Sequence, residues 1–251
     1  MQQIVRVWDG FVRSFHWLLV ALLLGLWFTG GELEYIDLHQ NLGLVVLALI
    51  ISRIMWGLVG SQTARFSDFV RTPWQGLHHL RDEFGGRARH TYGHNPAGAW
   101  MILLLLAMVL AQAISGLFTN DDLFFMGPLA GWVDYSTQRW LTRFHSNHFD
   151  WLLIAILVHV VVIFIYMIRG RDLLTPMFTG TKKAPDSLHA SGAAQASDNP
   201  ELSAGSAGHA KASKSTQPQA LNRATKPKLV NGWIGIGIFA CNLIWVFWWL
   251  G

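Results

Sequence analysis

Five long apolar segments dominate this sequence, and each is long enough to cross a lipid bilayer as an α-helix. They lie at about residues 14–30, 38–59, 97–119, 141–168 and 231–250, with the start of the fourth between residues 141 and 150. Within lipid a helix satisfies its own backbone hydrogen bonds. Only 14% of the residues are charged, well below the roughly 25% of soluble domains. The sequence therefore predicts an all-α membrane protein surrounded by lipid.

The distribution of Lys and Arg predicts the orientation of these spans. Basic residues gather before the first span, between the second and third, and after the fourth, where every Lys of the protein lies. The opposite side receives only Arg139 and Arg143, together with six acidic residues: Glu32, Glu34, Asp37, Asp121, Asp122 and Asp134. Because Lys and Arg are retained in the cytoplasm, we expect a cytoplasmic N-terminus and a periplasmic C-terminus. The same rule accounts for the basic loops, so we expect no nucleic-acid partner.

Composition divides the chain into three parts. Residues 1–180 contain four spans, which we expect to form a four-helix transmembrane bundle. Residues 181–229 are rich in Ala, Ser, Gly, Pro, Gln and Lys, too polar to offset the entropy of ordering, and are predicted to be a disordered cytoplasmic linker. Residues 230–251 form a Trp-rich fifth transmembrane helix containing Gly235 and Gly237. This tethered helix is expected to pack on the bundle or on another subunit, for example in a homodimer.

Four histidines lie in or at the edge of the spans: His16, His39, His145 and His159. His145 and His159 are 14 residues apart, which is about 21 Å along a helix and only about 40° around it. In the orientation above, His16 and His159 lie at the same depth in the bilayer, and so do His39 and His145. Because a haem iron takes an axial ligand on each side, which neighbouring helices supply, matched depth predicts two bis-His haem sites, one in each leaflet.

The single cysteine limits the kind of metal centre. Cys241 alone cannot provide a Cys-x-x-Cys-His haem attachment or an iron–sulfur cluster, so haem is expected to bind non-covalently through histidine. Two alternatives remain open from the residues. An intramembrane histidine also serves as a hydrogen-bond partner for a neighbouring helix. In addition, His148 is 11 residues from His159, about 20° off the same helix face, and competes with His145.

Arginines at the helix ends are candidates for binding the haem carboxylates. Arg53 is 14 residues after His39, on nearly the same face and at the inner end of the second span. Arg13 is a further candidate on that side, and Arg143 is one on the outer side. Snorkelling to the lipid headgroups is the competing interpretation for each of them.

A series of short motifs follows in order along about residues 5–180. These are Arg13-Ser-Phe-His16-Trp17, Leu38-His39-Gln-Asn-Leu-Gly43, Arg53-Ile-Met-Trp56-Gly57, Arg65-Phe66-Ser-Asp-Phe69, Gly93-His-Asn-Pro96 with Gly98, Gln112-Ala-Ile-Ser-Gly116-Leu-Phe118, His145, His159 and Met177-Phe-Thr-Gly180. In this order they resemble the prokaryotic cytochrome b561 family, especially the b-type cytochrome subunits of nickel–iron hydrogenases and the related formate dehydrogenase subunits.

The resemblance implies a four-helix core with two b haems in a bacterial inner membrane. The first and fourth helices would ligate the cytoplasmic-side haem, and the second and fourth the outer one. The fourth-helix ligands of the family are 14 residues apart, which selects His145 over His148. The resemblance also implies exchange with the quinone pool and with a periplasmic redox partner such as a hydrogenase, a dehydrogenase or a cytochrome c. The region after residue 180 lies outside the usual core.

Transmembrane electron transfer between quinone and a periplasmic partner is therefore the function that the sequence favours. One alternative is a superoxide:quinone oxidoreductase, as in some members of the family, although the acidic outer loops argue against an anionic substrate. The other alternative is a membrane anchor with structural histidines, which docks a partner through the outer loop of residues 120–142.

Overall fold

The computed structural model describes residues 4–70, 72, 74, 81, 96–183 and 228–251. Among these residues, five helices are long and apolar enough to cross a membrane: α1 (Gly10–Thr29), α2 (Ile36–Val59), α5 (Pro96–Gly116), α6 (Tyr135–Ile168) and α9 (Gly232–Leu250). They confirm the predicted all-α membrane fold. Most of the predicted linker, residues 184–227, and the start of the Gly93–Pro96 motif lie outside the described residues.

Polar side chains mark where three of these helices begin. The side chain of Asp9 accepts the backbone N–H of Val12 at the start of α1, and Asp134 accepts that of Thr137 at the start of α6. Asn231 caps α9 in the same way. Because of the cap at Asp134, α6 starts before the apolar segment and reaches 34 residues, about 51 Å. It is therefore longer than the roughly 30 Å apolar core of a bilayer.

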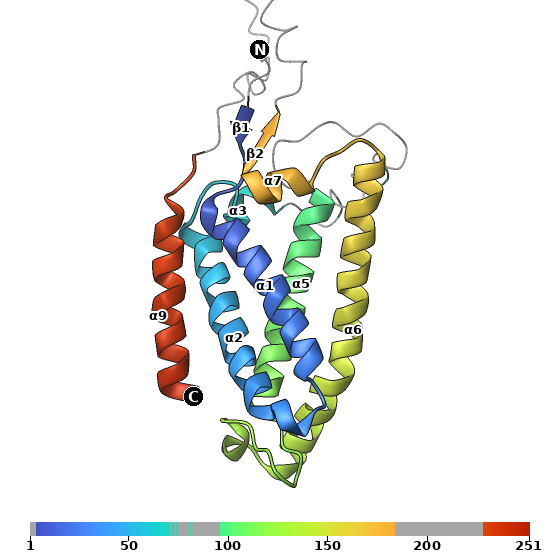
Figure 1. Cartoon of the computed structure of the whole chain (residues 1–251), viewed down its shortest axis with the longest axis vertical. Helices are drawn as coiled ribbons and strands as arrows, with labels where there is room; N and C mark the ends of the chain where they lie inside the picture. The colour runs from blue at the N-terminus through green and yellow to red at the C-terminus, as the bar shows by residue number, and fades with distance from the viewer. Residues whose placement is uncertain (1–3, 71, 73, 75–80, 82–95, 184–227) are drawn as a thin grey trace, which may run out of the picture.

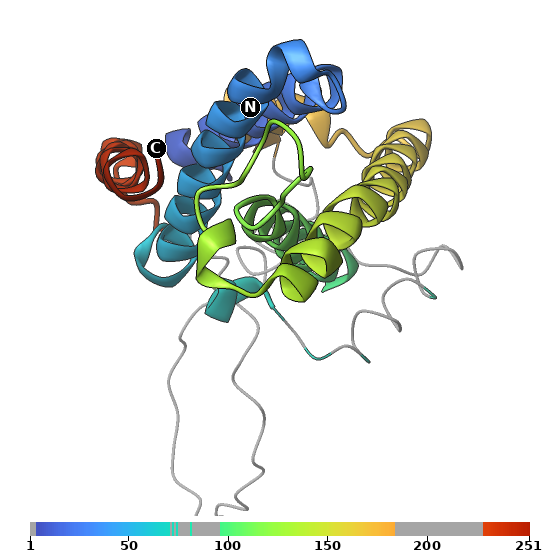
Figure 2. The same cartoon turned by 90° about the horizontal axis from the view of Figure 1, so that it is seen from below.

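Helix α2 is central to the packing, as Figures 1 and 2 show. It packs against α1, α5 and α9, whereas α6 packs chiefly against α5. The main apolar core joins Phe11 and Phe15 of α1, Leu49 and Trp56 of α2, and residues of α5 and α6. Two short 3₁₀ helices (Leu33–Tyr35 and Ala130–Trp132) and the short helix α3 (Phe66–Phe69) lie in the connections.

Helix α9 packs on the bundle, which was one of the two placements expected for the fifth span. Gly235 lies so close to the ring of Phe11 that a Cβ atom there would be 2.4 Å from it. Farther along the helix, Asn242 Nδ2 donates to Ser52 Oγ of α2 at 2.9 Å. The polypeptide before the helix is held as well, since Val230 N donates to Ser61 Oγ at 2.9 Å.

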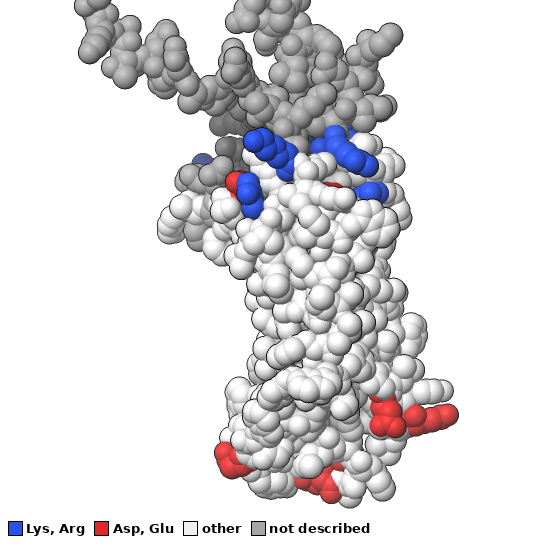
Figure 3. Space-filling view, turned by 90° about the vertical axis from the view of Figure 1, so that its left-hand side faces the viewer, with Lys and Arg blue, Asp and Glu red and all other residues white. Residues whose placement is uncertain are grey.

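The two ends of the bundle carry opposite charge (Figure 3). At one end, the basic end, strands β1 (Ile4–Arg6) and β2 (Thr181–Lys183) pair antiparallel next to helix α7 (Leu174–Thr179). Its described basic residues include Arg6, Arg13, Arg65, Arg169, Arg171 and Lys182. The other, acidic end consists of the α1–α2 and α5–α6 connections and the first turns of α6, and contains Glu32, Glu34, Asp37, Asp121, Asp122 and Asp134.

Candidate functional site

The structure brings the four predicted histidines together in two pairs, both involving α6. Near the acidic end, the imidazoles of His39 (α2) and His145 (α6) have ring centroids 6.4 Å apart and planes at 84°. Nearer the basic end, His16 of α1 interacts electrostatically with His159 of α6. These are the pairs that share a depth in the sequence-based prediction.

The His39 ring is held by a hydroxyl group of α1. Thr29 Oγ1 lies 3.1 Å from His39 Nδ1, and it also donates to the backbone oxygen of Gly25 at 2.8 Å. A hydroxyl has one proton to donate, and here that proton bonds Gly25. Thr29 Oγ1 therefore accepts the hydrogen bond of Nδ1–H, and the tautomer of His39 leaves the lone pair on Nε2.

The His145 ring is held by two oxygen atoms of α5. Its Nδ1 atom lies 3.0 Å from the backbone oxygen of Gln112 and 3.2 Å from Ser115 Oγ. Since a carbonyl only accepts hydrogen bonds, Nδ1 carries the proton and Nε2 again keeps its lone pair. Gly116 makes this approach possible, because a Cβ atom at that position would lie 3.0 Å from the His145 ring.

His148, the competing residue, is occupied differently. Its Nδ1 lies 2.8 Å from the side-chain oxygen of Gln112, and its ring stacks on Phe144 with centroids 4.8 Å apart. The side-chain nitrogen of Gln112 in turn donates to the backbone oxygen of His145 at 2.9 Å, so Gln112 bonds a neighbouring helix as the sequence analysis expected. Of the two histidines, His145 is the one that the structure places beside His39.

The His16–His159 pair has no comparable hydrogen bonds. Within the described part of the chain, neither ring forms a side-chain hydrogen bond, and His16 Nδ1 is buried without a partner. Helix α6 makes no contact with α1 comparable to its packing on α5. Val20 and Trp27, which lie four and eleven residues after His16 and hence on its face of α1, are 37% and 52% exposed. Protein side chains therefore leave this face of α1 incompletely covered.

The three candidate arginines lie in different surroundings. Arg53 is 2% exposed, its Nη2 donates to the backbone oxygen of Ala64 at 3.3 Å, and its Nη1 is buried without a partner. Its guanidinium lies over the Phe66 ring. Arg13 Nη1 donates to the backbone oxygen of Phe178 at 2.6 Å, which ties α1 to α7. Arg143 is exposed near the acidic end.

These features fit a metal-containing cofactor in which most of the metal's ligands belong to the cofactor and the protein supplies two. No cluster of three or more His, Cys, Asp or Glu side chains suited to a metal ion occurs among the described residues, so a protein-only metal cage is not formed there. Two imidazoles on opposite sides of one ion, each with a metal–nitrogen bond of about 2 Å, have ring centroids about 6 Å apart, close to the 6.4 Å observed. The fixed Nδ1–H tautomers are those of histidines that bind a metal through Nε2.

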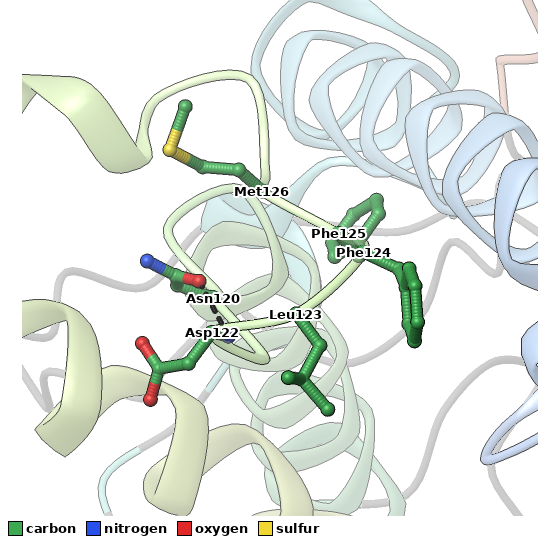
Figure 4. A pocket seen from close by; sticks show the side chains of 6 residues that line it. All are labelled: Asn120, Asp122, Leu123, Phe124, Phe125 and Met126. Atoms are coloured by element: carbon green, nitrogen blue, oxygen red, sulfur yellow. Dashed lines mark hydrogen bonds between the residues drawn. The ribbon is translucent and has the colours of Figure 1, made fainter.

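The α5–α6 connection forms a second candidate surface, at the acidic end (Figure 4). The Asp121 carboxylate accepts backbone N–H groups of Phe125, Leu123 and Phe124, and these hydrogen bonds lower the pKa of Asp121 below its ordinary value. Asp122, held by Arg139 at 2.7 Å, has a φ of 64°. The tip of this ordered loop exposes Leu123 and Phe124, each 79% accessible.

Sequence reasoning missed the residues that orient the imidazoles. Thr29 lies in no motif, and Ser115 lies within the motif of residues 112–118 but was given no role there. Each acts through its position against a histidine on another helix. The signal that did exist is the helical spacing of Ser115, three residues after Gln112 and hence on the same side of α5.

The fold and these histidine pairs define a helical membrane protein suited to hold haem between helices. Comparison with protein families identifies it further: the model of the family described as "Prokaryotic cytochrome b561" matches residues 7–180. The chain belongs to this family, whose members carry electrons across membranes with b-type haem. A search of curated proteins finds no match.

Proposed function

We propose that this protein carries electrons across a membrane through two b-type haems, each bound by a pair of histidines. His39 and His145 hold one group near the acidic end, and His16 and His159 hold the other nearer the basic end. When bound, the haems supply the one-electron chemistry, while the protein supplies axial ligands, position and surrounding charge. The His39–His145 pair carries the proposal, because its ring spacing and both of its tautomers would let the two Nε2 atoms hold one haem iron.

Arg53 is the residue that we assign to the carboxylate groups of the haem near the basic end. A buried cation is stable only when paired or hydrogen-bonded, and Nη1 of Arg53 has no partner within the described structure. Asp9 is close enough to interact with it electrostatically, but the Asp9 carboxylate already accepts hydrogen bonds from Val12 N and Trp56 Nε1. At the other site we propose Arg143, which is exposed two residues before His145. Arg13, also predicted for this role, contacts the backbone of α7 instead.

We further propose that the protein lies in the bacterial inner membrane with its basic end in the cytoplasm. The separation of charge in Figure 3 supports this orientation through the retention of Lys and Arg inside. Quinone or quinol is the proposed membrane substrate. A periplasmic redox protein is the proposed second partner, with the α5–α6 loop as its contact.

The observations favour this function over both alternatives. A superoxide-oxidising enzyme needs an anion to approach the outer face, where six carboxylates lie beside only Arg139 and Arg143. A pure membrane anchor has no need for two histidines with hydrogen-bonded Nδ1 atoms and facing rings.

The decisive experiment measures total haem in the purified full-length protein by its pyridine haemochrome spectrum, and identifies the haem that remains in each variant by the reduction potential and absorption spectrum of the native protein. We expect two b haems per chain, and we expect His16→Ala and His159→Ala to lose the same one, while His39→Ala loses the other. One haem or none in the unaltered protein would contradict the proposal, as would His16→Ala and His39→Ala removing the same haem. The reductant that reduces the haems then distinguishes the two functions. Reduction by a quinol analogue supports an electron carrier, and reduction by superoxide supports a superoxide-oxidising enzyme.

A further inference from the structure

The two histidine pairs differ in the hydrogen bonds that their rings make within the protein. Near the acidic end, Thr29 accepts from His39 Nδ1–H, and Ser115 and the backbone oxygen of Gln112 accept from His145 Nδ1–H. Near the basic end, the structure contains no such acceptor in its described residues, and the buried Nδ1 of His16 is left without a partner. In the first pair, each ring is thus oriented by a hydrogen bond from its Nδ1 atom. In the second pair, the described residues provide no such hydrogen bond.

This difference has a consequence for any iron that the rings bind. A hydrogen bond donated by Nδ1–H makes the imidazole a more basic ligand at Nε2. A more basic ligand stabilises ferric iron over ferrous iron, because the ferric state carries one more positive charge. Hydrogen bonding around the ligands is one of the factors that set the reduction potential of a haem. Since, among the four proposed ligands, the described residues offer acceptors only to His39 and His145, these acceptors would lower the potential of a haem at that pair.

The net charges at the two ends act in the same direction. At the acidic end six carboxylates outnumber Arg139 and Arg143, whereas the buried guanidinium of Arg53 is six residues from the basic end of α2, as His16 is from that end of α1. Negative charge favours the ferric state, and positive charge favours the ferrous state. Asp9 offsets part of the charge of Arg53, so the hydrogen bonds carry the argument and the charges add to it.

We propose that Thr29 and Ser115 are tuning residues that hold the haem at the His39–His145 pair at a lower reduction potential than the haem at the His16–His159 pair. This inference rests on the proposed function. It assigns a preferred direction, from the acidic end toward the basic end, to the movement of single electrons. Each electron that the haem at one pair would give up would be taken up by the haem at the other, so the transfer would need no proton and no further oxidant or reductant.

An optical redox titration of the purified two-haem protein tests this inference. We expect two components of different potential in the unaltered chain. The component that remains in His16→Ala identifies the haem at the acidic end, and it should be the lower one. Thr29→Val and Ser115→Ala should each shift this lower component to more positive potential and leave the upper one in place. Thr29→Ser keeps the hydroxyl and should restore the original value.

Ser52→Ala is the matched control, because it removes a buried hydroxyl of the same bundle that contacts Ala48 and Asn242 rather than a histidine. It should leave both potentials unchanged. The inference is overturned if the remaining component in His16→Ala is the upper one, or if neither Thr29→Val nor Ser115→Ala moves the lower one while haem content stays at two. Fewer than two haems in the unaltered chain would instead overturn the proposed function itself.

Discussion

Helices α2 and α6 both carry proposed ligands, yet the protein covers them very differently. α2 buries ten of its 24 residues between α1, α5 and α9. α6 buries three of its 34, Gln138, Leu152 and Tyr166. The position of α2 is thus set by contacts with three helices, whereas α6, which packs chiefly against α5, has little protein around the middle of its length.

Contacts at its two ends fix the position of α6 in the bundle. At the acidic end, Asn120 and Gln138 are hydrogen bonded at 2.7 Å, and Arg139 pairs with Asp122. At the basic end the chain after α6 returns to the segment that precedes α1, where Val7 N donates to the backbone oxygen of Gly180 at 2.7 Å. In lipid, helices associate through packing and polar contacts rather than through the hydrophobic effect. If the proposed function holds, haems bound between the helices would supply the contacts of the middle of α6 with α1 and α2.

The largest effect expected is the loss of one haem from α6. His145→Ala should remove about half of the haem, because it deletes an axial ligand. His148→Ala is the matched control on the same helix, and it should retain both haems because its ring bonds Gln112 rather than facing His39. Haem-to-protein ratios from the pyridine haemochrome spectrum measure this. Equal loss of haem in the two variants would contradict the assignment of His145, rather than His148, as the ligand.

Removal of haem should affect α6 far more than α2. In protein prepared without haem, we expect amide hydrogen exchange in the middle of α6, around residues 150–163, to rise at least about tenfold, while the middle of α2 stays protected. The reason is that α2 keeps its contacts with three helices and α6 loses those supplied by haem. Exchange followed by mass spectrometry gives the measurement, and equal protection of both helices would show that the protein alone holds α6.

Equivalent leucine substitutions should differ between the two helices. Leu49 of α2 is 1% exposed, and Leu49→Ala should lower the free energy of unfolding by about 2 kcal/mol, because it leaves a cavity. Leu157 of α6 is 61% exposed, and Leu157→Ala should change it by less than about 0.5 kcal/mol. Equilibrium unfolding in mixed micelles measures both. A large effect at Leu157 would place a protein contact on α6 that the structure does not contain.

The contact of α9 with the bundle can be tested with two glycines of the same helix. Gly235→Val should destabilise the packing of α9 by about 1–2 kcal/mol, since the new side chain meets the Phe11 ring. Gly237→Val has nothing within 4 Å of its Cβ and should be neutral. Protease susceptibility of the segment before α9, with thermal unfolding beside it, reports the difference. Equal behaviour of the two variants would argue against this placement of α9.

The smallest effect should come from lowering the pH, which should loosen the α5–α6 loop when Asp121 is protonated. Hydrogen bonds from Phe125, Leu123 and Phe124 lower the pKa of Asp121 from the usual 3.8. A lowered folded pKa contributes stability above the unfolded value and loses it as the pH falls through the folded one. Below about pH 4 we therefore expect lower protection factors at these three amides, that is, faster exchange relative to the intrinsic rate at that pH, with the protection factors of α2 unchanged. Asp121→Asn keeps an acceptor but does not titrate, so its loop should show no such dependence on pH.

Much of this protein was predictable because the membrane imposes its own rules. Lipid demands long apolar helices, so the five spans could be located from hydropathy. The family could be identified from short motifs in order along residues 7–180. The start of α6 was placed too late, because Asp134 caps a polar extension of the helix that apolar periodicity does not reveal.

The sequence by itself determined the spans, the separation of charge and the 14-residue spacing that places two histidines on one face of α6. These are properties of single segments, set by side-chain chemistry and the helical repeat. The family resemblance had selected His145 over His148, but only the tertiary structure decided that the His145 ring faces His39, that Thr29 and Ser115 orient the rings, and that α9 packs on α1 and α2. Those features depend on how each helix is rotated and placed against its neighbours, which packing determines and local sequence does not.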